Sequence, residues 1–359
     1  MSILRKMYRG EQEFDFPKLW RPALIGSLVL VLLSVGSLGL RGLNLGIDFE
    51  GGTSWEVVAP EASVADARDA LANTGAAAGK IQTVGSDSIR VRADLDDVDA
   101  IVVVTEAMAA LGNADTTDVS VTTVGPSWGD QITSKARNAL VWFLIIVAVY
   151  IAVRLEWKMA VGALVAVAHD IVISVGVYSI FQFEVTPATV IAFLTIMGYS
   201  LYDTIVVYDK VREISGRLSG TGRYTYNEMM NLALNRVLMR SINTSITSML
   251  PVASMLIVGS FILGALTLQE FAIALLIGIL VGSYSSIFVA SSVVAFMKSR
   301  EESHAAVAKK VDGRGLTGDG TRSVSAEDAA LGTTPTRSTA DRPRAGNAPP
   351  KPRKKKKKA

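Results

Sequence analysis

The sequence lacks cysteine entirely and contains only two histidines, His169 and His304. The absence of cysteine excludes disulfides, thiolate metal sites and cysteine nucleophiles. With so few histidines, histidine-rich metal sites and most histidine-based catalysis are disfavoured. There is no phosphate-binding loop, nucleophile elbow or metal-ligand cluster, and Gly51-Gly52 alone is too weak a signal for a phosphate cradle. We therefore expect no enzyme activity, no metal and no cofactor.

Hydrophobic residues, by contrast, are abundant and clustered: they make up 50% of the 359 residues, and the mean hydropathy is positive. Nearly uncharged runs of about 20 residues match a hydrocarbon core of roughly 30 Å. The first run is longer than a signal-peptide core, and no small-x-small cleavage site follows it. The sequence predicts six transmembrane helices, at residues 19–40, 134–153, 159–181, 188–208, 242–263 and 271–297.

Basic residues indicate the orientation of these helices. Arg154 and Lys158 lie between the second and third helices, and the loop 209–241 on the same side is rich in lysine and arginine. The opposite turns, near 182–187 and 264–270, contain neither. Because short cytoplasmic loops carry the excess of positive charge, both termini, residues 1–18 and 298–359, are predicted to be cytoplasmic. We expect a multi-pass protein of the cell membrane.

The segment 41–133 lies on the outer side and has its own pattern of strands and helices. Ser63 and Asp66 form a capping box, and Asp96 or Asp97 can cap a second helix that ends near Leu111. The strands are predicted at 53–58, 81–84, 88–93 and 119–124, with a hairpin at 85–87. The order βαββαβ predicts a small ferredoxin-like α+β domain.

On the cytoplasmic side, Thr225 and Glu228 form a capping box for an amphipathic helix that continues to Arg240. One face of this helix carries Met230, Leu234, Val237 and Leu238, so we expect it to lie along the membrane surface and lead into the fifth transmembrane helix. From about Ser299 the chain lacks periodicity and is expected to be disordered. It ends in the polybasic run 351–358.

Asp203 is the most informative residue. It interrupts the fourth predicted helix about five residues from the cytoplasmic end, roughly 7–8 Å inside at 1.5 Å per residue. A carboxylate at that depth is costly unless it is paired, hydrated or protonated, which makes it a functional candidate. Desolvation raises the pKa of such a carboxyl, whereas a nearby cation lowers it. A proton carrier needs this competition, because the group can then change its charge within the working pH range. The alternative is a satisfied structural carboxylate.

Arg240 begins the fifth helix on the same side of the membrane. If the fourth and fifth helices pack antiparallel, Arg240 and Asp203 meet at a similar depth. The alternative is that Arg240 extends to the lipid headgroups. Since nothing in the chain would hydrolyse ATP, a transmembrane proton gradient is the natural source of energy for a buried aspartate.

Further polar residues lie within the predicted helices. Asp170, next to His169, is deeper than Asp203, although a single histidine in a bundle is more often a packing residue. Tyr199, Asn243 and Thr244 are supporting polar residues, and the run 241–248 either lines a hydrated path or bonds across helices. Pro251 predicts a kink. A four-residue repeat of small side chains in the sixth helix indicates close packing within the bundle or against a partner: Ala274, Gly278, Gly282, Ser286 and Ala290.

A series of short motifs runs from the end of the first predicted helix into the sixth. They are Gly46-Ile47-Asp48-Phe49-Glu50-Gly51-Gly52-Thr53, Val124-Gly125-Pro126, Ala168-His169-Asp170, the run from Gly198 to Glu213, Arg240 to Ser245, and Ser285 to Ser291. This series resembles the signatures of the SecD/SecF family of bacterial preprotein translocase subunits. The resemblance covers roughly residues 20–297, and the single short outer domain favours the SecF branch.

The resemblance implies a role beside the SecY-SecE-SecG channel, in a complex with SecD and within the resistance-nodulation-division superfamily. Such pairs use the proton motive force to complete translocation of unfolded preproteins after the ATPase SecA has acted. Asp203 and Arg240 match the family's proton-coupling positions. Tyr202 departs from the pattern, since many relatives have Asn there. The basic tail is also outside the pattern; such segments bind anionic lipid or ribosomal RNA, or are merely solvated.

Two other functions remain open from the sequence. A half-size proton-coupled efflux or lipid transporter of the same superfamily would also use a buried aspartate, but efflux relatives carry large outer domains in both halves. A scaffold without a transport cycle would use the outer domain only for binding. The substitution Asp203→Asn separates coupling from scaffolding.

Overall fold

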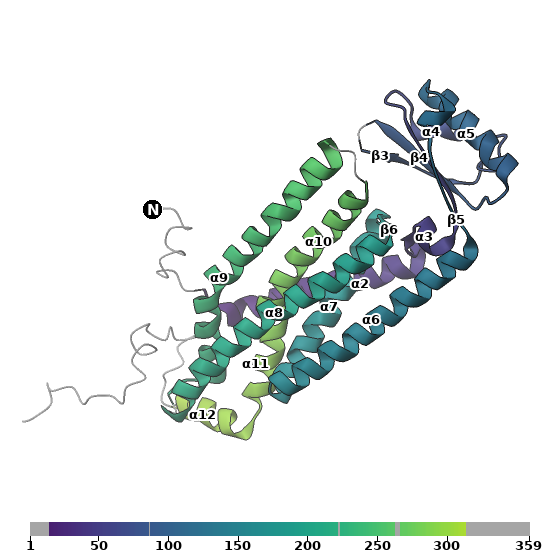
Figure 1. The fold of residues 1–359 in the computed structure, drawn as a ribbon. Coiled ribbons are helices and arrows are strands. Elements are labelled where there is room, and N and C mark those ends of the chain that lie inside the picture. The colour runs from purple at the N-terminus through teal and green to yellow at the C-terminus, as the bar shows by residue number, and fades with distance from the viewer. Residues whose placement is uncertain (1–13, 86, 222, 263–265, 314–359) are drawn as a thin grey trace, which may run out of the picture. The chain divides into compact units, whose positions relative to one another are not determined.

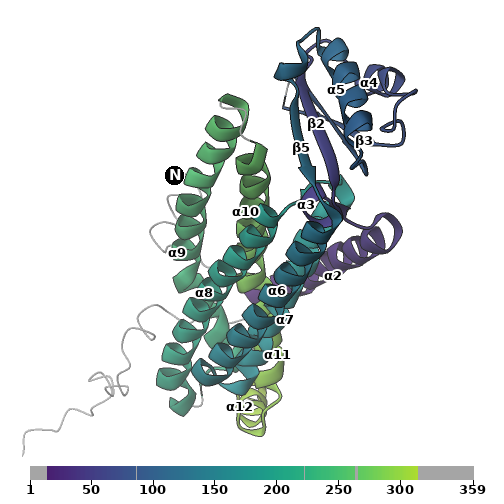
Figure 2. The same ribbon diagram turned by 45° about the vertical axis from the view of Figure 1, so that its right-hand side comes forward.

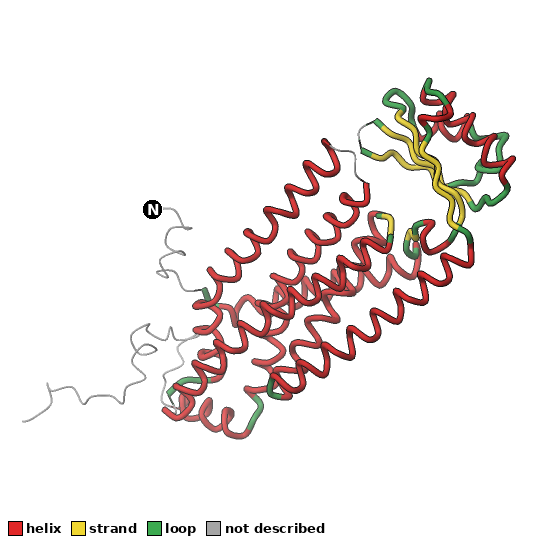
Figure 3. Tube along the Cα trace, viewed as in Figure 1, coloured by secondary structure: helices red, strands yellow, loops and turns green. Residues whose placement is uncertain are grey.

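The computed structural model describes residues 14–85, 87–221, 223–262 and 266–313. All of these belong to one compact unit, Met1–Ser323. Among the described residues, six helices are long and apolar enough to cross a membrane (Figure 3). The chain is thus a polytopic helical membrane protein, as the hydropathy pattern predicts.

The long helices begin and end at recognisable signals. Asp15 caps α2 by accepting a hydrogen bond from the Lys18 amide, and proline occupies the first turn of α2, α6 and α8, where its missing N–H costs nothing. Their bounds are α2 Phe16–Arg41, α6 Pro126–Arg154, α7 Trp157–Phe181, α8 Pro187–Leu218, α9 Tyr226–Ser254 and α10 Leu266–Ser285 (Figure 1). Helix α6 therefore starts eight residues before the predicted 134–153.

Two of the helices continue through π-helical segments. Pro251 lies inside α9, and Met255–Ile262 follows as a π-helix. Since proline removes one backbone donor from the helical ladder, an altered hydrogen-bond pattern after it is expected. The kink predicted at Pro251 stays a prediction. In the last span, α10 continues into a π-helical turn, Ser286–Ala290, and then into α11, Ser291–Ser299.

The prediction that 209–241 is a loop is wrong for most of this stretch, whereas the helix predicted behind the Thr225–Glu228 capping box is present and leads into the fifth span. Helix α8 continues to Leu218, and α9 begins at Tyr226 behind the Thr225–Glu228 capping box and runs unbroken through Arg240. No glycine or proline interrupts this stretch before Pro251, so nothing ends the helix where the membrane span was expected to begin. The apolar face of its first turns is buried within the protein: Met230, Leu234 and Val237.

The prediction of disorder from about Ser299 is also wrong for the first part of the tail. Residues Glu302–Gly313 form helix α12. It is attached through Glu301, which pairs with Lys158 of α7 at 2.7 Å, and through Val311, which is buried. The helix forms despite the weak periodicity of its sequence because the burial of Val311 and the ion pair of Glu301 stabilise it. The rest of the tail, including the run 351–358, lies outside the described residues.

Helices α8 and α10 lie side by side and run parallel. A side chain at Gly278 would meet Ile196, one at Gly282 would meet Ser200, and the Ser286 hydroxyl lies 2.9 Å from that of Thr204. Each of these pairs is separated by 82 residues along the chain, as for Ser286 and Thr204, and a constant separation means that the two helices run in the same direction. The small-residue stripe of the sixth span therefore packs within this chain, against α8.

The segment after α2 forms an α+β unit. Its strands are β2 (Gly52–Val58), β3 (Lys80–Val84), β4 (Ser88–Ala93) and β5 (Ser120–Val124), with α4 (Val64–Ala70) after β2 and α5 (Val98–Gly112) after β4. The sheet has the order β3-β4-β2-β5, and all its strand pairs are antiparallel. Both helices cover one face of it (Figure 2). Their core includes Trp55, Leu71, Ile89, Val91 and Met108.

Short elements connect this unit to the long helices. Strand β1 (Asn44–Leu45) pairs in parallel with β6 (Glu184–Val185), which lies between α7 and α8. A one-turn helix, α3 (Ile47–Glu50), follows β1. Gly51 and Gly52 then adopt positive φ values of 81° and 99°, a conformation that other residues rarely adopt. The double glycine therefore makes the turn into β2.

Candidate functional site

Asp203 is buried where α8 faces α9. Its residue is 9% exposed, and its Oδ2 atom accepts a hydrogen bond from the Ser241 hydroxyl at 2.6 Å. A hydrogen bond of this length to a carboxylate is of the strong, charge-assisted type. The predicted carboxyl thus lies inside the bundle, with a donor supplied by the neighbouring helix.

Arg240 does not contact Asp203 directly. Its Nη2 atom lies 3.3 Å from the Tyr202 hydroxyl, and the guanidinium attracts the Asp203 carboxyl at longer range. Tyr202 and Asp203 are consecutive on α8, and Arg240 and Ser241 are consecutive on α9, so the contacts Tyr202–Arg240 and Asp203–Ser241 lie next to each other. The helices thus bring the cation and the acid together, with Tyr202, the residue that departs from the family pattern, binding the cation.

The other polar residues of α9 form a ladder of hydroxyl contacts. Ser245 bonds the carbonyl oxygen of Ser241 and lies 2.6 Å from the Ser283 hydroxyl of α10. Thr244 donates to the Arg240 carbonyl oxygen, and Asn243 is exposed. Thus Ser245 bonds across helices, whereas Asn243 and Thr244 do not touch Asp203. Tyr199 of α8 is half-buried.

Asp170 lies at a second buried polar cluster. Its Oδ2 atom accepts hydrogen bonds from Ser200 of α8 at 2.5 Å and from Ser285 of α10 at 2.8 Å. His169 Nδ1 lies 3.1 Å from the other carboxyl oxygen, while His169 Nε2 is buried with no hydrogen-bond partner. The predicted packing role of His169 does not account for that unpartnered nitrogen.

A third cluster joins the α+β unit to the segment between α7 and α8, at the end of the helices that was predicted to face outward. Glu184 of β6 accepts from Arg90 at 3.1 Å and from Arg92 at 3.0 Å, and both arginines belong to β4. Arg92 is 5% exposed and also binds the Asn44 side chain and the Leu45 carbonyl oxygen. Removing the charges of Glu184 and Arg92 from water is costly unless the pair has good geometry and additional hydrogen bonds. The contacts of Glu184 and Arg92 supply both. We call this group the outer clasp.

Electrostatics in the outer clasp follow from its acids. Burial by itself would lower the pKa of Arg90, but attraction to Glu184, Glu56 and Glu270 outweighs it, so the pKa of Arg90 is raised. Burial raises the pKa of Asp48 in α3, and repulsion from Glu184 raises it further.

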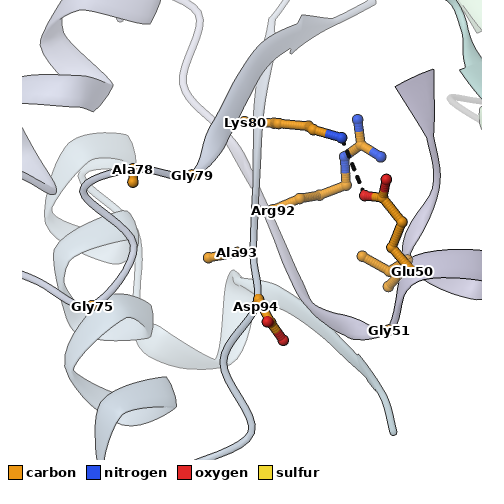
Figure 4. Close-up of a pocket in the computed structure, with 10 residues that line it drawn as sticks. Glu50, Gly51, Gly75, Ala78, Gly79, Lys80, Arg92, Ala93 and Asp94 are labelled. Atoms are coloured by element: carbon orange, nitrogen blue, oxygen red, sulfur yellow. Dashed lines mark hydrogen bonds and ion pairs between the residues drawn. The ribbon is translucent and has the colours of Figure 1, made fainter. Parts of the chain in front are cut away.

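The signature residues of the first motif surround this clasp. The Gly46 amide donates to the Val185 carbonyl oxygen at 2.9 Å, and Gly51 lines a cavity of about 480 Å³. Figure 4 shows that cavity, where Lys80 and Glu50 form an ion pair at 3.1 Å. Gly125 caps α6, and Pro126 opens it. These residues build the connection of the α+β unit to the helices.

Sequence reasoning did not assign the partners of the two buried acids, which are Ser241 for Asp203, and Ser200 and Ser285 for Asp170. It missed the cluster of Glu184, Arg90 and Arg92 altogether. The polar run 241–248 was expected to line a hydrated path or to bond across helices, but the sequence does not show which hydroxyl meets which acid, and Glu184 lies in a short turn between two predicted helices. The signal for Ser200 was its position three residues before Asp203. Within the described ranges, no three His, Asp or Glu side chains meet in a group that could hold a metal ion.

Fold and site together define a polytopic membrane protein with two buried carboxyls between its helices and an α+β unit attached at one end. The family described as "Protein export membrane protein SecD/SecF, C-terminal" matches residues 103–300, and the "SecD/SecF GG Motif" matches residues 36–57. The chain therefore belongs to the SecD/SecF family.

Curated relatives are named "Protein translocase subunit SecF". That of Streptomyces coelicolor is 37% identical over 326 residues, which cover 90% of this chain and 87% of the relative. That of Mycobacterium tuberculosis is 38% identical over 312 residues, 84% of this chain and 71% of the relative. The family and these relatives make the chain a membrane component of protein export.

The structure is similar to that of SecDF, a translocon-associated membrane protein from Thermus thermophilus, with a TM-score of 0.73 and 33% identity. The match covers 81% of this chain and 39% of the SecDF chain. A second SecDF structure, in a super-membrane-facing form, matches with a TM-score of 0.57 and 30% identity. This chain thus corresponds to less than half of a SecDF chain.

Proposed function

We propose that the protein is an accessory subunit of the Sec preprotein translocase which, together with SecD, uses the proton motive force to complete translocation after the SecA step. The observation that carries the proposal is the burial of Asp203 between α8 and α9, with Ser241 as its direct donor. A carboxyl whose contacts join two helices changes their fit when it gains or loses a proton. Arg240, held one residue away by Tyr202, supplies the countercharge.

A polar surface on the membrane-spanning part supports the partnership with SecD. Arg240, Asn243 and Thr247 are exposed in this chain, and Tyr202 is 55% exposed. Charged and amide groups facing lipid are costly, so a partner must cover this face. The SecDF relatives, of which this chain matches 39%, support SecD in that position.

The α+β unit is, in this proposal, a ferredoxin-like domain on the outer side of the membrane that engages emerging preproteins. Its order of elements and its strand order β3-β4-β2-β5 support that fold. The outer clasp fastens it to the segment between α7 and α8. A shift of α8 caused by Asp203 therefore reaches the domain through a short, charged connection.

The orientation and the remaining partners belong to the same proposal. Arg154, Lys158 and the basic residues of 209–241 support cytoplasmic termini. The SecY-SecE-SecG channel and unfolded preproteins are then the partners of the outer and membrane parts. The basic tail would contact anionic lipid.

The test is Asp203→Asn in vesicles that contain the full chain with SecD and the translocation channel. We expect translocation to lose its acceleration by a proton gradient while SecD still co-purifies. Asp209→Asn is the matched control, because Asp209 lies on the same helix, six residues on, and only forms a half-exposed pair with Arg154. Translocation that keeps its full gradient dependence in Asp203→Asn would reject coupling and favour a scaffold.

A further inference from the structure

Asp170 joins three helices through its carboxyl group. It is 3% exposed, and a single oxygen atom, Oδ2, accepts from Ser200 of α8 and from Ser285 of α10. Buried polar groups left without partners are costly, so these hydrogen bonds hold both helices against α7. We call this group the inner clasp: Asp170, Ser200 and Ser285.

The inner clasp acts on the same helix as Asp203. Ser200 precedes Asp203 by three residues, which corresponds to about 4.5 Å along α8 and about 300° around it. The Ser286 hydroxyl, one residue after Ser285, lies 2.9 Å from that of Thr204 and 3.3 Å from the Ser200 carbonyl oxygen. A rotation of α8 at Ser200 therefore changes how Asp203 faces Ser241.

Space beside the inner clasp allows such a rotation. An apolar cavity of about 300 Å³ is lined by Asp170, by Leu140 of α6, and by Ile196 and Met197 of α8, which lie about one turn before Ser200. Close-packed interiors resist rearrangement, whereas a cavity lets a helix shift without displacing its neighbour.

Among the described residues, the Asp170 carboxyl contacts no lysine or arginine; its partners there are Ser200, Ser285 and His169, the last of these a cation only when protonated. The ring of Tyr284 lies 6.2 Å from that of His169. The other titratable groups on the neighbouring helices bond elsewhere: Arg41 to the Ile180 carbonyl oxygen, Arg154 to Asp209, Asp203 to Ser241, Tyr208 to the Ala290 carbonyl oxygen, Glu270 to Arg90 and Lys298 to Glu156.

We propose that Asp170 is a positioning residue of the coupling site, which sets the rotation of α8 that presents Asp203 to Ser241. The inference rests on the proposed function, because it gives Asp170 a part in the same proton-coupled step. Hydrogen-bond acceptance, not the charge of Asp170, is the property that the role requires.

The experiment measures gradient-driven translocation as a function of pH, with the full chain and SecD in vesicles. Ser200→Ala with Ser285→Ala removes both donors and leaves the carboxyl in place. We expect this double variant to shift the pH profile by about one unit, the scale of one hydrogen bond to a charged group. Asp170→Asn, whose amide oxygen still accepts both hydroxyls, should keep the wild-type profile. Ser174→Ala is the matched control, one turn away on α7 and equally buried.

Two results would overturn the proposal. The first is a double variant that keeps the wild-type pH profile, or whose translocation rate falls by the same factor at every pH. Either outcome would mean that the inner clasp only contributes to packing. A shifted profile in Asp170→Asn would assign the effect to its charge. Asp203→Asn is measured alongside: if it behaves as wild type, the proposed function fails, whereas if it loses coupling and the clasp variants shift nothing, only this inference fails.

Discussion

Ser241 donates its hydroxyl to the Asp203 carboxylate at 2.6 Å, and the neighbouring Arg240 reaches Tyr202 instead of Asp203. The direct donor to the buried acid is thus a neutral hydroxyl from an antiparallel helix, and the cation acts from one residue away. This arrangement leaves the charge of Asp203 only partly compensated, which suits a group that exchanges a proton.

Replacing Ser241 by alanine should shift the pH dependence of gradient-driven translocation. The ionised carboxylate loses its direct donor, so the protonated form persists to higher pH and the profile moves up by about one unit. Thr247→Ala is the control, since that hydroxyl bonds only carbonyl oxygens of its own helix. Equal profiles for the two variants would mean that Ser241 is a packing residue.

Glu184→Gln should loosen the connection between the α+β unit and the helices. It removes the acid that pairs with Arg90 and with Arg92, and breaking a buried pair from one side costs about 3 kcal/mol. Hydrogen exchange at the paired strands β1 and β6 reports the opening. Glu50→Gln is the matched control, because its pair with Lys80 is about half-exposed and contributes less than about 1 kcal/mol. Equal protection in both variants would show that the outer clasp is not a stabilising contact.

Gly278→Val should destabilise the packing of α10 on α8. The added side chain meets Ile196, and overpacking of this kind costs about 1–3 kcal/mol. Gly36→Val on α2 makes the same chemical change where a Cβ meets no atom within 4 Å. The thermal unfolding temperature of the full chain in detergent is measured for both variants. A similar decrease in both would mean that valine destabilises the helix backbone itself and that the contact with Ile196 does not matter.

Docking of α12 should weaken in acid. The hydrogen bond from Lys158 lowers the pKa of Glu301 below its ordinary value of 4.5, with further help from Lys298. A lowered pKa means that the stabilisation is present above the unfolded value and is lost as pH falls through the folded one. Hydrogen-exchange protection of 302–313, corrected for intrinsic rates, should fall about two- to five-fold below pH 4.

Glu301→Gln should abolish that pH dependence, whereas Glu302→Gln, on the exposed neighbouring position, should retain it. Protection that stays pH-dependent in Glu301→Gln would assign the effect to another group. His304 is the nearest alternative, since its ring lies 5.0 Å from that of Tyr226 and burial lowers its pKa.

Local signals in the sequence were sufficient for most elements of the fold. The capping boxes at Ser63 and Thr225 start helices in the structure, and β3 and β4, on either side of the predicted hairpin, pair antiparallel. Where prediction failed, at 209–241 and 302–313, the periodicity of a short segment was outweighed by its continuity with, or packing against, other helices.

For the candidate site, residue type and depth were enough to single out Asp203, Asp170 and Arg240, but not their partners. A charge inside an apolar run is visible without any neighbour, because its cost depends on depth alone. The roles of the Ser241, Ser200 and Ser285 hydroxyls can be recognised only once the structure shows which carboxyl each of them contacts.

The sequence by itself thus determined which segments are apolar enough to cross the membrane, where the helices behind Ser63 and Thr225 start, and that Asp203 and Asp170 are buried, since each follows from neighbouring residues and from the free energy of transfer into lipid. The tertiary structure alone decided the parallel register of α8 and α10, the donors of both buried carboxyls and the pairing of Glu184 with Arg90 and Arg92. These depend on the relative rotation and depth of helices, which side-chain packing sets across separations of up to 115 residues, as between Asp170 and Ser285.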